Sequence, residues 1–199
     1  SAPVVDRSGN DNGGNFATTD MTDVATYRVG EVIRPIDSAV WDFDGTDDSI
    51  ATTGVADSTA LTVEMWVYPE DTTARRYLLN SGDFDINIDV HSAGMRINRN
   101  NANHPRYTNP SLNVWTHFVV TAPNKTSDPI VYFNGVVQTG SSADYGTILS
   151  SGTNIGNYSA ASPTALFEGK IATVAVYKTV LTPQQIVENF NQQRSRFNI

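Results

Sequence analysis

The sequence predicts an all-β protein whose antiparallel strands pack as a sandwich, and three observations support that prediction. The dipeptide Asn134-Gly135 separates the apolar residues 131–133 from residues 136–137. This is the strongest short-range hairpin signal, because a type I′ turn needs positive φ at both central residues. Residues 115–121 are mostly aromatic or β-branched, as in buried strands. The 14 glycines and 9 prolines supply the many turns that such a fold requires.

The composition fits one globular domain spanning residues 1–199, with its core motifs between residues 39 and 190. Hydrophobic residues make up 39% of the chain, which is enough for a packed core. No apolar run reaches the roughly 18 residues of a membrane-spanning helix. The formal charge of -8 predicts no attraction to nucleic acid. The lack of cysteine excludes disulfides, Cys-ligated zinc and thiol catalysis.

The N-terminal third begins with loop-forming residues and then shows clear strand patterns. The first 38 residues are rich in Gly, Asn and Asp, and we expect one or two edge strands among surface loops there. Residues 40–43 lead into Asp44-Gly45, a second hairpin signal. The side chains of residues 61–68 form two alternating sets. One set should face the core, and the other, which is half aromatic, needs partial cover. The core set is Leu61, Val63, Met65 and Val67, and the second set is Thr62, Glu64, Trp66 and Tyr68.

A polar hairpin is expected between residues 84 and 98. Apolar residues recur at every second position as far as Val90, residues 91–94 form the turn, and a second strand starts at Met95. We expect Val90 to lie opposite Met95, which fixes the register of the whole hairpin. The resulting pairs are Ile88 with Ile97 on the core face, and Asp89 with Arg96 and Asn87 with Asn98 on the outer face.

The C-terminal part predicts two more strands and one helix. A short strand is expected at residues 154–156 and a buried one at residues 169–177. Thr182 then fits the N-cap of a helix, with Pro183 at its first position and Gln185 completing a capping box. The apolar face of this helix should comprise Ile186, Val187 and Phe190.

Four motifs, taken in order, resemble those of one known family. They are VWDFDGTDDSI, LTVEMWVYP, VWTHFVVT with VYFNGVV, and NIGN followed by LFEGKIATVAVYKTVLTPQQI. Over residues 39–190 the chain resembles the laminin G-like, concanavalin A-like lectin and glucanase domains. Its end, VENFNQQRSRF, resembles laminin G-like modules of bacteriophage structural proteins. The resemblance implies a two-sheet antiparallel jelly-roll sandwich with one short C-terminal helix.

Polar side chains of the hairpin are candidates for ligand contacts. Acidic and amide groups alternate along one strand face, and arginines lie across the hairpin. The candidates are Asp85, Asn87, Asp89, Arg96, Asn98 and Arg99, with Asp83 at the start of the same face. Three interpretations stay open. They are a solvated face neutralised by Arg96 and Arg99, a face that hydrogen-bonds sugars, and a carboxyl pair about 5 Å apart as in retaining glycosidases.

Aromatic and polar loop residues form a second candidate set. A tyrosine ring stacks on the apolar face of a sugar while polar groups orient the hydroxyls, so the two kinds of residue together are typical of carbohydrate sites. Ordinary solvated loops have a similar composition, and that alternative stays open. The members of the set are His104, Tyr107, Tyr145 and Tyr158, beside Arg99 and Arg106.

A cluster of acids after residue 41 suggests calcium, which takes six to eight oxygen ligands. Thr53 stands where an EF-hand requires glutamate, so acids that merely form a turn are the alternative. The resemblance implies calcium at the sandwich rim, but Ala172 stands where many relatives carry an acid. The calcium candidates are Asp44, Asp47 and Asp48, next to Asp42.

The three histidines share no ligand spacing, so no zinc site is expected. His91 lies in a predicted turn and His104 in a polar loop. His117 lies inside a strand, and we interpret it as a hydrogen-bonded residue of the sandwich. The Gly-x-Ser-x-Gly elbow of serine hydrolases does not occur either.

The sequence therefore favours a non-catalytic binding or adhesion module that recognises a glycan or a protein on a cell or virion surface. One alternative is a structural or decoration domain of a phage particle, whose partners are other virion subunits and which oligomerises. A glycoside hydrolase is the other alternative, because this fold hosts both binders and enzymes. The chain begins with Ser1 rather than Met, which predicts excision from a longer polypeptide. The expected location is extracellular or the virion surface.

Overall fold

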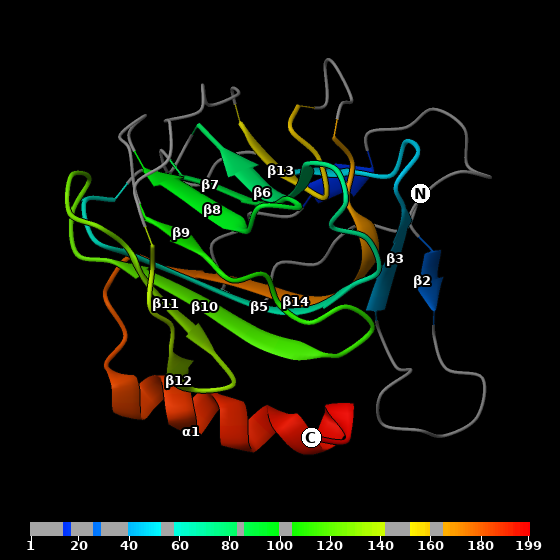
Figure 1. Ribbon diagram of the computed structural model, residues 1–199. Coiled ribbons are helices and arrows are strands. Elements are labelled where there is room, and N and C mark those ends of the chain that lie inside the picture. Colours follow the sequence, from blue (N-terminus) through cyan, green and yellow to red (C-terminus); the bar gives the residue numbers. More distant parts are fainter. Residues whose placement is uncertain are drawn as a thin grey trace.

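Two antiparallel sheets face each other in the computed structural model of the protein, and a C-terminal helix lies outside one of them (Figure 1). The structure describes residues 40–52, 58–82, 86–99, 105–141, 152–159 and 165–199, and the backbone of residues 14–16 and 26–28. Each sheet has seven strands within these ranges. The predicted all-β, two-sheet sandwich with one short C-terminal helix is confirmed.

The chain crosses several times between the two sheets. Sheet A contains, in spatial order, β1 (Gly14–Phe16), β4 (Ile50–Thr52), β13 (Thr153–Ile155), β6 (Arg76–Ser81), β7 (Ile86–Val90), β8 (Met95–Arg99) and β9 (Arg106–Tyr107). Sheet B contains β12 (Val136–Val137), β11 (Ile130–Phe133), β10 (Thr116–Ala122), β5 (Leu61–Pro69), β14 (Glu168–Tyr177), β3 (Val40–Asp44) and β2 (Thr26–Arg28). β1 and β2 end the two sheets, as expected for edge strands near the N-terminus.

The core lies between the sheets and uses the alternation predicted from the sequence. Burying each large apolar side chain there contributes about 1.5–3 kcal/mol. From β5, the core contains Leu61, Val63, Met65 and Val67, each at most 1% exposed. From sheet A, the opposite wall consists mainly of Leu79, Ile86, Ile88, Val90, Met95 and Ile97.

Two of the expected hairpins form, namely β11–β12 and β7–β8. Asn134 and Gly135 have φ values of 51° and 79°, which give the type I′ turn between β11 and β12. Asn134 is also anchored, because its Oδ1 accepts a hydrogen bond from the backbone N–H of His117 at 2.9 Å. In the β7–β8 hairpin, Asp89 lies opposite Arg96, as expected.

The hairpin predicted at Asp44-Gly45 is wrong. β3, before the turn, pairs within sheet B, whereas β4, after it, pairs within sheet A. Gly45 has a φ of 77°, so the chain does turn there. The side chains of Asp44 and Asp48 then accept backbone hydrogen bonds within the turn. The N–H of Thr46 donates to Asp44 Oδ1 at 2.7 Å, and the N–H of Asp44 donates to Asp48 Oδ2 at 3.1 Å. The result is a corner that carries the chain from one sheet to the other.

The helix α1 (Pro183–Gln193) begins as predicted. Thr182 is the N-cap, its hydroxyl accepts from the N–H of Gln185 at 3.2 Å, and the Gln185 side chain accepts from the N–H of Thr182 at 2.9 Å. Pro183 occupies the first turn. No helix of the described residues is long and apolar enough to cross a membrane.

The end of the chain supplies the cover that the half-aromatic face of β5 requires. Trp66 stacks on Phe197 of the short 3-10 helix η1 (Arg194–Phe197), with ring centroids 3.9 Å apart, and on Phe190 at 6.0 Å. Ile186 is fully buried. Val187 was predicted on the same apolar face, but it is 40% exposed, because it lies on the side of α1 turned toward the β11–β12 turn.

Candidate ligand-binding site

Sheet A carries two rows of polar side chains on the face turned away from the core. One row crosses four adjacent strands and consists of asparagines alone. In this asparagine row, Asn154 lies opposite Asn80, Asn80 opposite Asn87, and Asn87 opposite Asn98. All four residues are closed to solvent, with exposed fractions of 3% or less.

The second row, which we call the charged row, lies two residues from the asparagine row on β7 and β8 and extends to β6 on one side and β9 on the other. Tyr77 is opposite Asp89, Asp89 opposite Arg96, and Arg96 opposite Arg106. Arg96 donates to Asp89 through Nε and Nη2 at 2.8–2.9 Å. This ion pair is buried, with 0% of Asp89 and 6% of Arg96 exposed. The interpretation of this face as a solvated one is therefore wrong, because alternation assigns residues to a face without showing whether that face is covered.

Arg99 does not belong to this set. It lies opposite Ile86, and residues directly opposite each other share a face, so Arg99 is on the core side. Its Nη2 donates to the carbonyls of Ser58 and Thr59 at 2.6 and 3.0 Å. The sequence places Arg99 among the ligand contacts and among the neutralising charges of the outer face, and the structure corrects both. Arg99 instead closes one corner of the sandwich.

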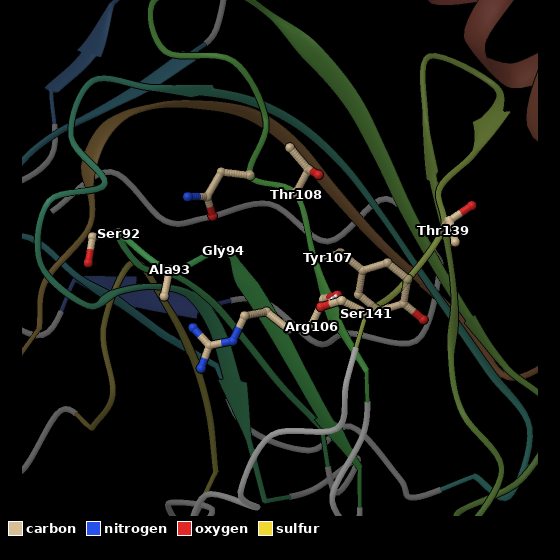
Figure 2. A pocket seen from close by; sticks show the side chains of 9 residues that line it. Ser92, Ala93, Gly94, Arg106, Tyr107, Thr108, Thr139 and Ser141 are labelled. Atoms are coloured by element: carbon tan, nitrogen blue, oxygen red, sulfur yellow. Dashed lines mark hydrogen bonds between the residues drawn. The ribbon is translucent and has the colours of Figure 1, made fainter.

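A pocket of about 370 Å³ opens beside the turn of the β7–β8 hairpin (Figure 2). Its walls are mostly hydroxyl and amide groups, and Arg106 is the one charged residue among the described residues that line it. Because Arg106 also belongs to the charged row, the pocket continues the polar face of sheet A. The lining residues are Ser92, Ala93, Gly94, Arg106, Tyr107, Thr108, Asn109, Thr139 and Ser141.

The walls of the pocket are fixed by backbone contacts. Gly94 has a φ of 114°, and a Cβ there would lie 2.6 Å from the carbonyl oxygen of Tyr107, so only glycine allows this approach. Asn109 donates from Nδ2 to the carbonyl of His91 at 2.8 Å. The buried Oδ1 of Asn109 has no hydrogen-bond partner in the described part of the chain. The pocket thus combines the exposed hydroxyl groups of Ser92, Thr108 and Thr139 with the guanidinium group of Arg106.

The structure places the predicted tyrosines at two ends of this surface. Tyr107 borders the pocket, but it is only 5% exposed and belongs to the core cluster, and its hydroxyl donates to the carbonyl of Pro129, so its ring is not a free surface for a sugar. Tyr158 packs against Tyr77 with ring centroids 5.3 Å apart, and its carbonyl accepts from Asn80 Nδ2 at 2.9 Å. Tyr158 therefore lies beside the asparagine row. Three further candidates fall outside the described residues, namely Asp85, His104 and Tyr145.

The calcium candidates do not gather into a metal site. Within the described ranges, no group of three or more His, Cys, Asp or Glu residues is arranged to hold a metal ion. Asp44 and Asp48 accept backbone hydrogen bonds in the corner after β3, as the turn-forming alternative requires. Asp47 lies in the same corner. These acids shape the connection between the sheets.

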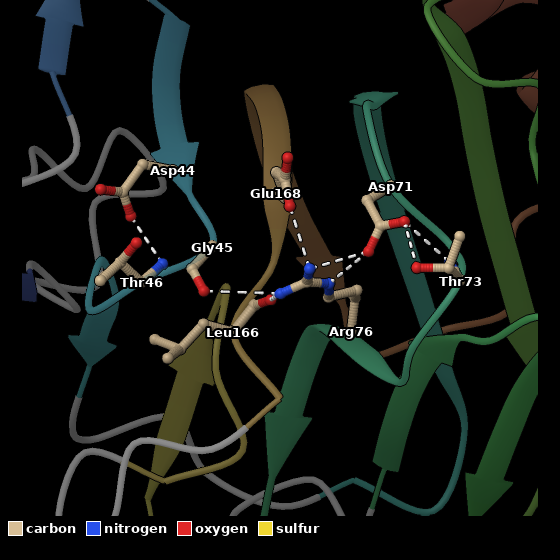
Figure 3. A network of polar contacts seen from close by, with 8 residues as sticks. All are labelled: Asp44, Gly45, Thr46, Asp71, Thr73, Arg76, Leu166 and Glu168. Atoms are coloured by element: carbon tan, nitrogen blue, oxygen red, sulfur yellow. Dashed lines mark hydrogen bonds and ion pairs between the residues drawn. The ribbon is translucent and has the colours of Figure 1, made fainter.

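A network around Arg76 joins the two sheets at their rim (Figure 3). From β6, Arg76 contacts Asp71 at 2.8 Å and Glu168 of β14 at 3.0 Å, and it donates to the carbonyl of Leu166 at 3.0 Å. Burial raises the pKa of Asp71, but hydrogen bonds from Thr73 and the charge of Arg76 outweigh it, so the pKa lies below its usual value. This network ties β6 of one sheet to β14 of the other.

The outer face of sheet B carries a buried carboxylate that is engaged on both oxygens. Glu64 of β5 accepts from His117 Nε2 at 2.9 Å, from the Tyr177 hydroxyl at 3.0 Å and from Asn189 Nδ2 of α1 at 2.8 Å. Burial raises the pKa of Glu64, but His117 and the other donors outweigh it and hold the pKa below its usual value. The prediction that His117 is a hydrogen-bonded residue of the sandwich is confirmed.

Comparison with models of known families identifies the family to which this chain belongs. The model of the concanavalin A-like lectin/glucanases superfamily matches residues 44–187. The chain belongs to this superfamily. The resemblance seen in the four sequence motifs is therefore confirmed. No curated protein sequence matches the chain.

Solved structures with the superfamily's sandwich include binding domains and enzymes. The binding domain of Paraclostridial Mosquitocidal Protein 1 is 17% identical, with a TM-score of 0.57, over 94% of this chain and 49% of that one. The botulinum neurotoxin serotype D binding domain is 13% identical, with a TM-score of 0.60, over 95% and 49%. A Trypanosoma rangeli sialidase mutant displaying trans-sialidase activity is 15% identical, with a TM-score of 0.62, over 93% and 30%. The chain spans about half of the two binding domains, and identities this low show a shared fold alone.

Sequence reasoning missed three residues of this surface. Asn80 and Asn154 join the asparagine row only through the pairing of β13 with β6 and of β6 with β7. The NIGN motif contains Asn154, and its position next to the inward Ile155 indicates an outward side chain. That signal indicates which face of the strand carries Asn154, but not which residues lie beside it. Asn109 resembles every other loop asparagine, and no sequence signal sets it apart.

Proposed function

We propose that this protein is a non-catalytic binding module that recognises a glycan through the pocket beside the β7–β8 hairpin. The observation that carries the proposal is the lining of that pocket, which combines hydroxyl groups, an amide and one guanidinium in a concavity of about 370 Å³. Sugar hydroxyls both donate and accept hydrogen bonds, so they match a wall that offers both. Arg106 supplies donors, and the exposed hydroxyl groups of Ser92, Thr108 and Thr139 supply acceptors.

The superfamily and the fold support a binding role. The family description includes lectins, and two of the structurally similar proteins are binding domains of toxins by name. Glycan-recognising modules of this kind work outside cells, so we also propose an extracellular location. The possible role as a structural or adhesion domain of a phage particle, with virion subunits as partners, stays a prediction, because neither the pocket nor the fold bears on it.

The distribution of carboxylates favours binding over glycoside hydrolysis. A retaining glycosidase needs two carboxyl groups about 5 Å apart, and an inverting one needs them about 6.5–9.5 Å apart. Among the described residues of the pocket and the two polar rows, Asp89 is the one carboxylate, and Arg96 holds it in a buried ion pair. Glu64 lies on the other sheet beneath α1. These described groups therefore provide no acid and nucleophile pair.

A glycan array tests the proposal. The unaltered protein, displayed against neutral, uronic-acid and sialylated oligosaccharides, should bind at least one class, and calorimetry with the best-bound oligosaccharide should then give its affinity. Arg106→Ala should weaken that affinity at least tenfold, because a hydrogen bond to a charged group contributes about 1.5–3 kcal/mol. Val136→Ser is the matched control, since Val136 is 63% exposed on β12 of the other sheet.

Two results would contradict the proposal. One is an unaltered, folded protein that binds no oligosaccharide on the array at high concentration. The other is an affinity that Arg106→Ala and Val136→Ser reduce equally. Melting temperatures of both variants show whether a loss of affinity reflects unfolding.

A further inference from the structure

β12 forms one end of sheet B among the described strands, and its two side chains are exposed and apolar (Figure 1). Val136 is 63% exposed and Val137 is 58% exposed. Val187 of α1, 40% exposed, lies against the turn before β12, because a Cβ at Gly135 would be 3.1 Å from its Cγ2. Ile130 of β11, 43% exposed, shares the sheet face of Val137. We call Ile130, Val136, Val137 and Val187 the apolar edge.

The backbone of Val137 faces away from the rest of sheet B. A two-residue turn makes its flanking residues, Phe133 and Val136, a hydrogen-bonded pair, and the next pair of an antiparallel ladder is not hydrogen-bonded. That next pair is Tyr132 with Val137. The alternation continues one step further, where the N–H of Gln138 donates to the carbonyl of Val131 at 2.8 Å. The N–H and C=O of Val137 therefore point outward from β12.

This edge lacks the features that usually keep an exposed strand from pairing with another chain, such as charged side chains and proline. Residues 130–142 contain neither. On α1, the neighbours one turn away from Val187 are Gln184 and Asn191, which are also uncharged. The corresponding end of sheet A is different. There β9 carries Arg106, and the N–H and hydroxyl of Ser141 donate to the Arg106 carbonyl at 2.7 and 3.1 Å, so part of that edge is covered.

We propose that the apolar edge pairs with the apolar edge of a second copy of this chain, so that the two B sheets join across an antiparallel β12–β12 contact. Such an edge is self-complementary under a two-fold axis. With the axis at Val137, this residue exchanges both outward hydrogen bonds with the same residue of the second copy. The formal charge of -8 makes two copies repel each other, and an uncharged edge is where they approach with the least repulsion.

The pairing gives a weak dimer with two glycan pockets. A contact centred on a two-residue strand belongs to the small class of interfaces, so the dimer should form only at high protein concentration. Thr139 and Ser141, which line the pocket, follow Val137 by two and four residues, so both pockets lie near the two-fold axis. Two linked pockets strengthen binding to a surface that displays many glycans. This consequence rests on the proposed function, whereas the pairing itself does not.

Sedimentation velocity from micromolar to millimolar protein tests the pairing. The unaltered protein should move from its monomer mass of 21.6 kDa to twice that mass. Val137→Glu should stay monomeric, because it places like charges on both sides of the axis. Val114→Glu is the matched control, since Val114 is 47% exposed in the loop before β10, and it should dimerise as the unaltered protein does.

Val137→Pro separates strand pairing from simple contact of side chains. Proline removes the outward N–H of Val137 and no hydrogen bond between β11 and β12. The melting temperature should therefore stay the same. The affinity of the dimer should fall at least tenfold, because both copies lose a donor.

Three results would overturn the proposal. They are an unaltered protein that is monomeric at every concentration, a dimer that Val137→Glu and Val114→Glu weaken equally, and a dimer that Val137→Pro leaves intact. If Val137→Glu does not fold, Val137→Pro decides alone. Calorimetry with a soluble oligosaccharide should give the same affinity per pocket for Val137→Glu and the unaltered protein. A dimer without glycan binding would thus overturn the proposed function and support the pairing.

Discussion

Both sheets carry buried polar side chains on their outer faces, but Glu64 on sheet B and Asn87 on sheet A differ in their hydrogen-bond partners. On sheet B, Glu64 is 3% exposed and accepts hydrogen bonds from three side chains of β10, β14 and α1. On sheet A, Asn87 is equally buried and neither of its amide atoms has a partner among the described residues. Burial alone therefore does not show whether a polar group is satisfied, and its hydrogen-bond partners must be considered as well.

The difference follows from what each face packs against. α1 places Asn189 and Gln193 over β5, and Gln193 also accepts from Trp66 Nε1 at 2.9 Å. The helix and the sheet thus complete each other's hydrogen bonds, and the aromatic stack of Trp66 on Phe197 fills the remaining space. This face is already occupied by the protein's own residues. On sheet A, by contrast, Asn87 has no such partner among the described residues.

The largest expected effect is the loss of the buried carboxylate on sheet B. Glu64→Ala leaves His117, Tyr177 and Asn189 in a buried site without their common acceptor. We expect the free energy of unfolding to fall by about 4 kcal/mol, as when one partner of a buried ionic pair is removed. Urea denaturation measures this change. A variant as stable as the unaltered protein would show that the cluster beneath α1 is not scaffold, and the comparison of the two faces would fail.

Low pH should lower the stability of the fold through protonation of Glu64. The pKa of Glu64 in the folded protein lies below its usual 4.5, so its contribution is complete above pH 4.5 and disappears as the pH falls through the lower folded value. The pKa of Asp71 is lowered as well, so the contributions of the two carboxylates must be distinguished. Urea midpoints of the unaltered protein should therefore fall more steeply below pH 4.5 than those of Glu64→Gln. Parallel curves for the two proteins would remove Glu64 as the source.

The smallest expected effect comes from the turn beside α1. Gly135 has a φ of 79°, and a Cβ there would approach Val187 Cγ2 to 3.1 Å. Gly135→Ala should lower the free energy of unfolding by about 1 kcal/mol, because a left-handed conformation is unfavourable for any residue with a Cβ. Its glycan affinity should not change. Val137→Ala, at a 58% exposed position of β12, is the control and should alter neither quantity. A loss of affinity in Gly135→Ala would show that the two faces are coupled.

The sequence was sufficient for features that depend on neighbouring residues. The period of two along β5 gave its core face, and the capping box at Thr182 gave the start of α1. The turn residues fixed the register of β7 against β8, so Asp89 and Arg96 were paired correctly. At Asp44-Gly45 the same reasoning failed, because a turn signal does not reveal whether the following strand returns to the same sheet.

The candidate site was predictable only in part, since it depends on contacts between distant segments. Asn87, Asp89, Arg96 and Asn98 share one face as expected, but their burial comes from tertiary packing that alternation does not encode. The asparagine row requires β13 beside β6, and the cluster at Glu64 requires β10, β14 and α1 around β5. Arg99 was misplaced for a related reason. Its two backbone acceptors come from residues 58–59, which lie far from it in the sequence.

The most direct test of the contrast between the two faces is a side-chain NMR titration. In the ¹⁵N-labelled protein, the side-chain NH₂ signal of Asn109 reports on the pocket beside sheet A, and the indole N–H of Trp66 reports on sheet B. Addition of the best-bound oligosaccharide should shift the Asn109 signal and leave that of Trp66 in place. An Asn109 signal that stays fixed at saturation, or a shift confined to Trp66, would contradict the assignment of the pocket as the ligand site.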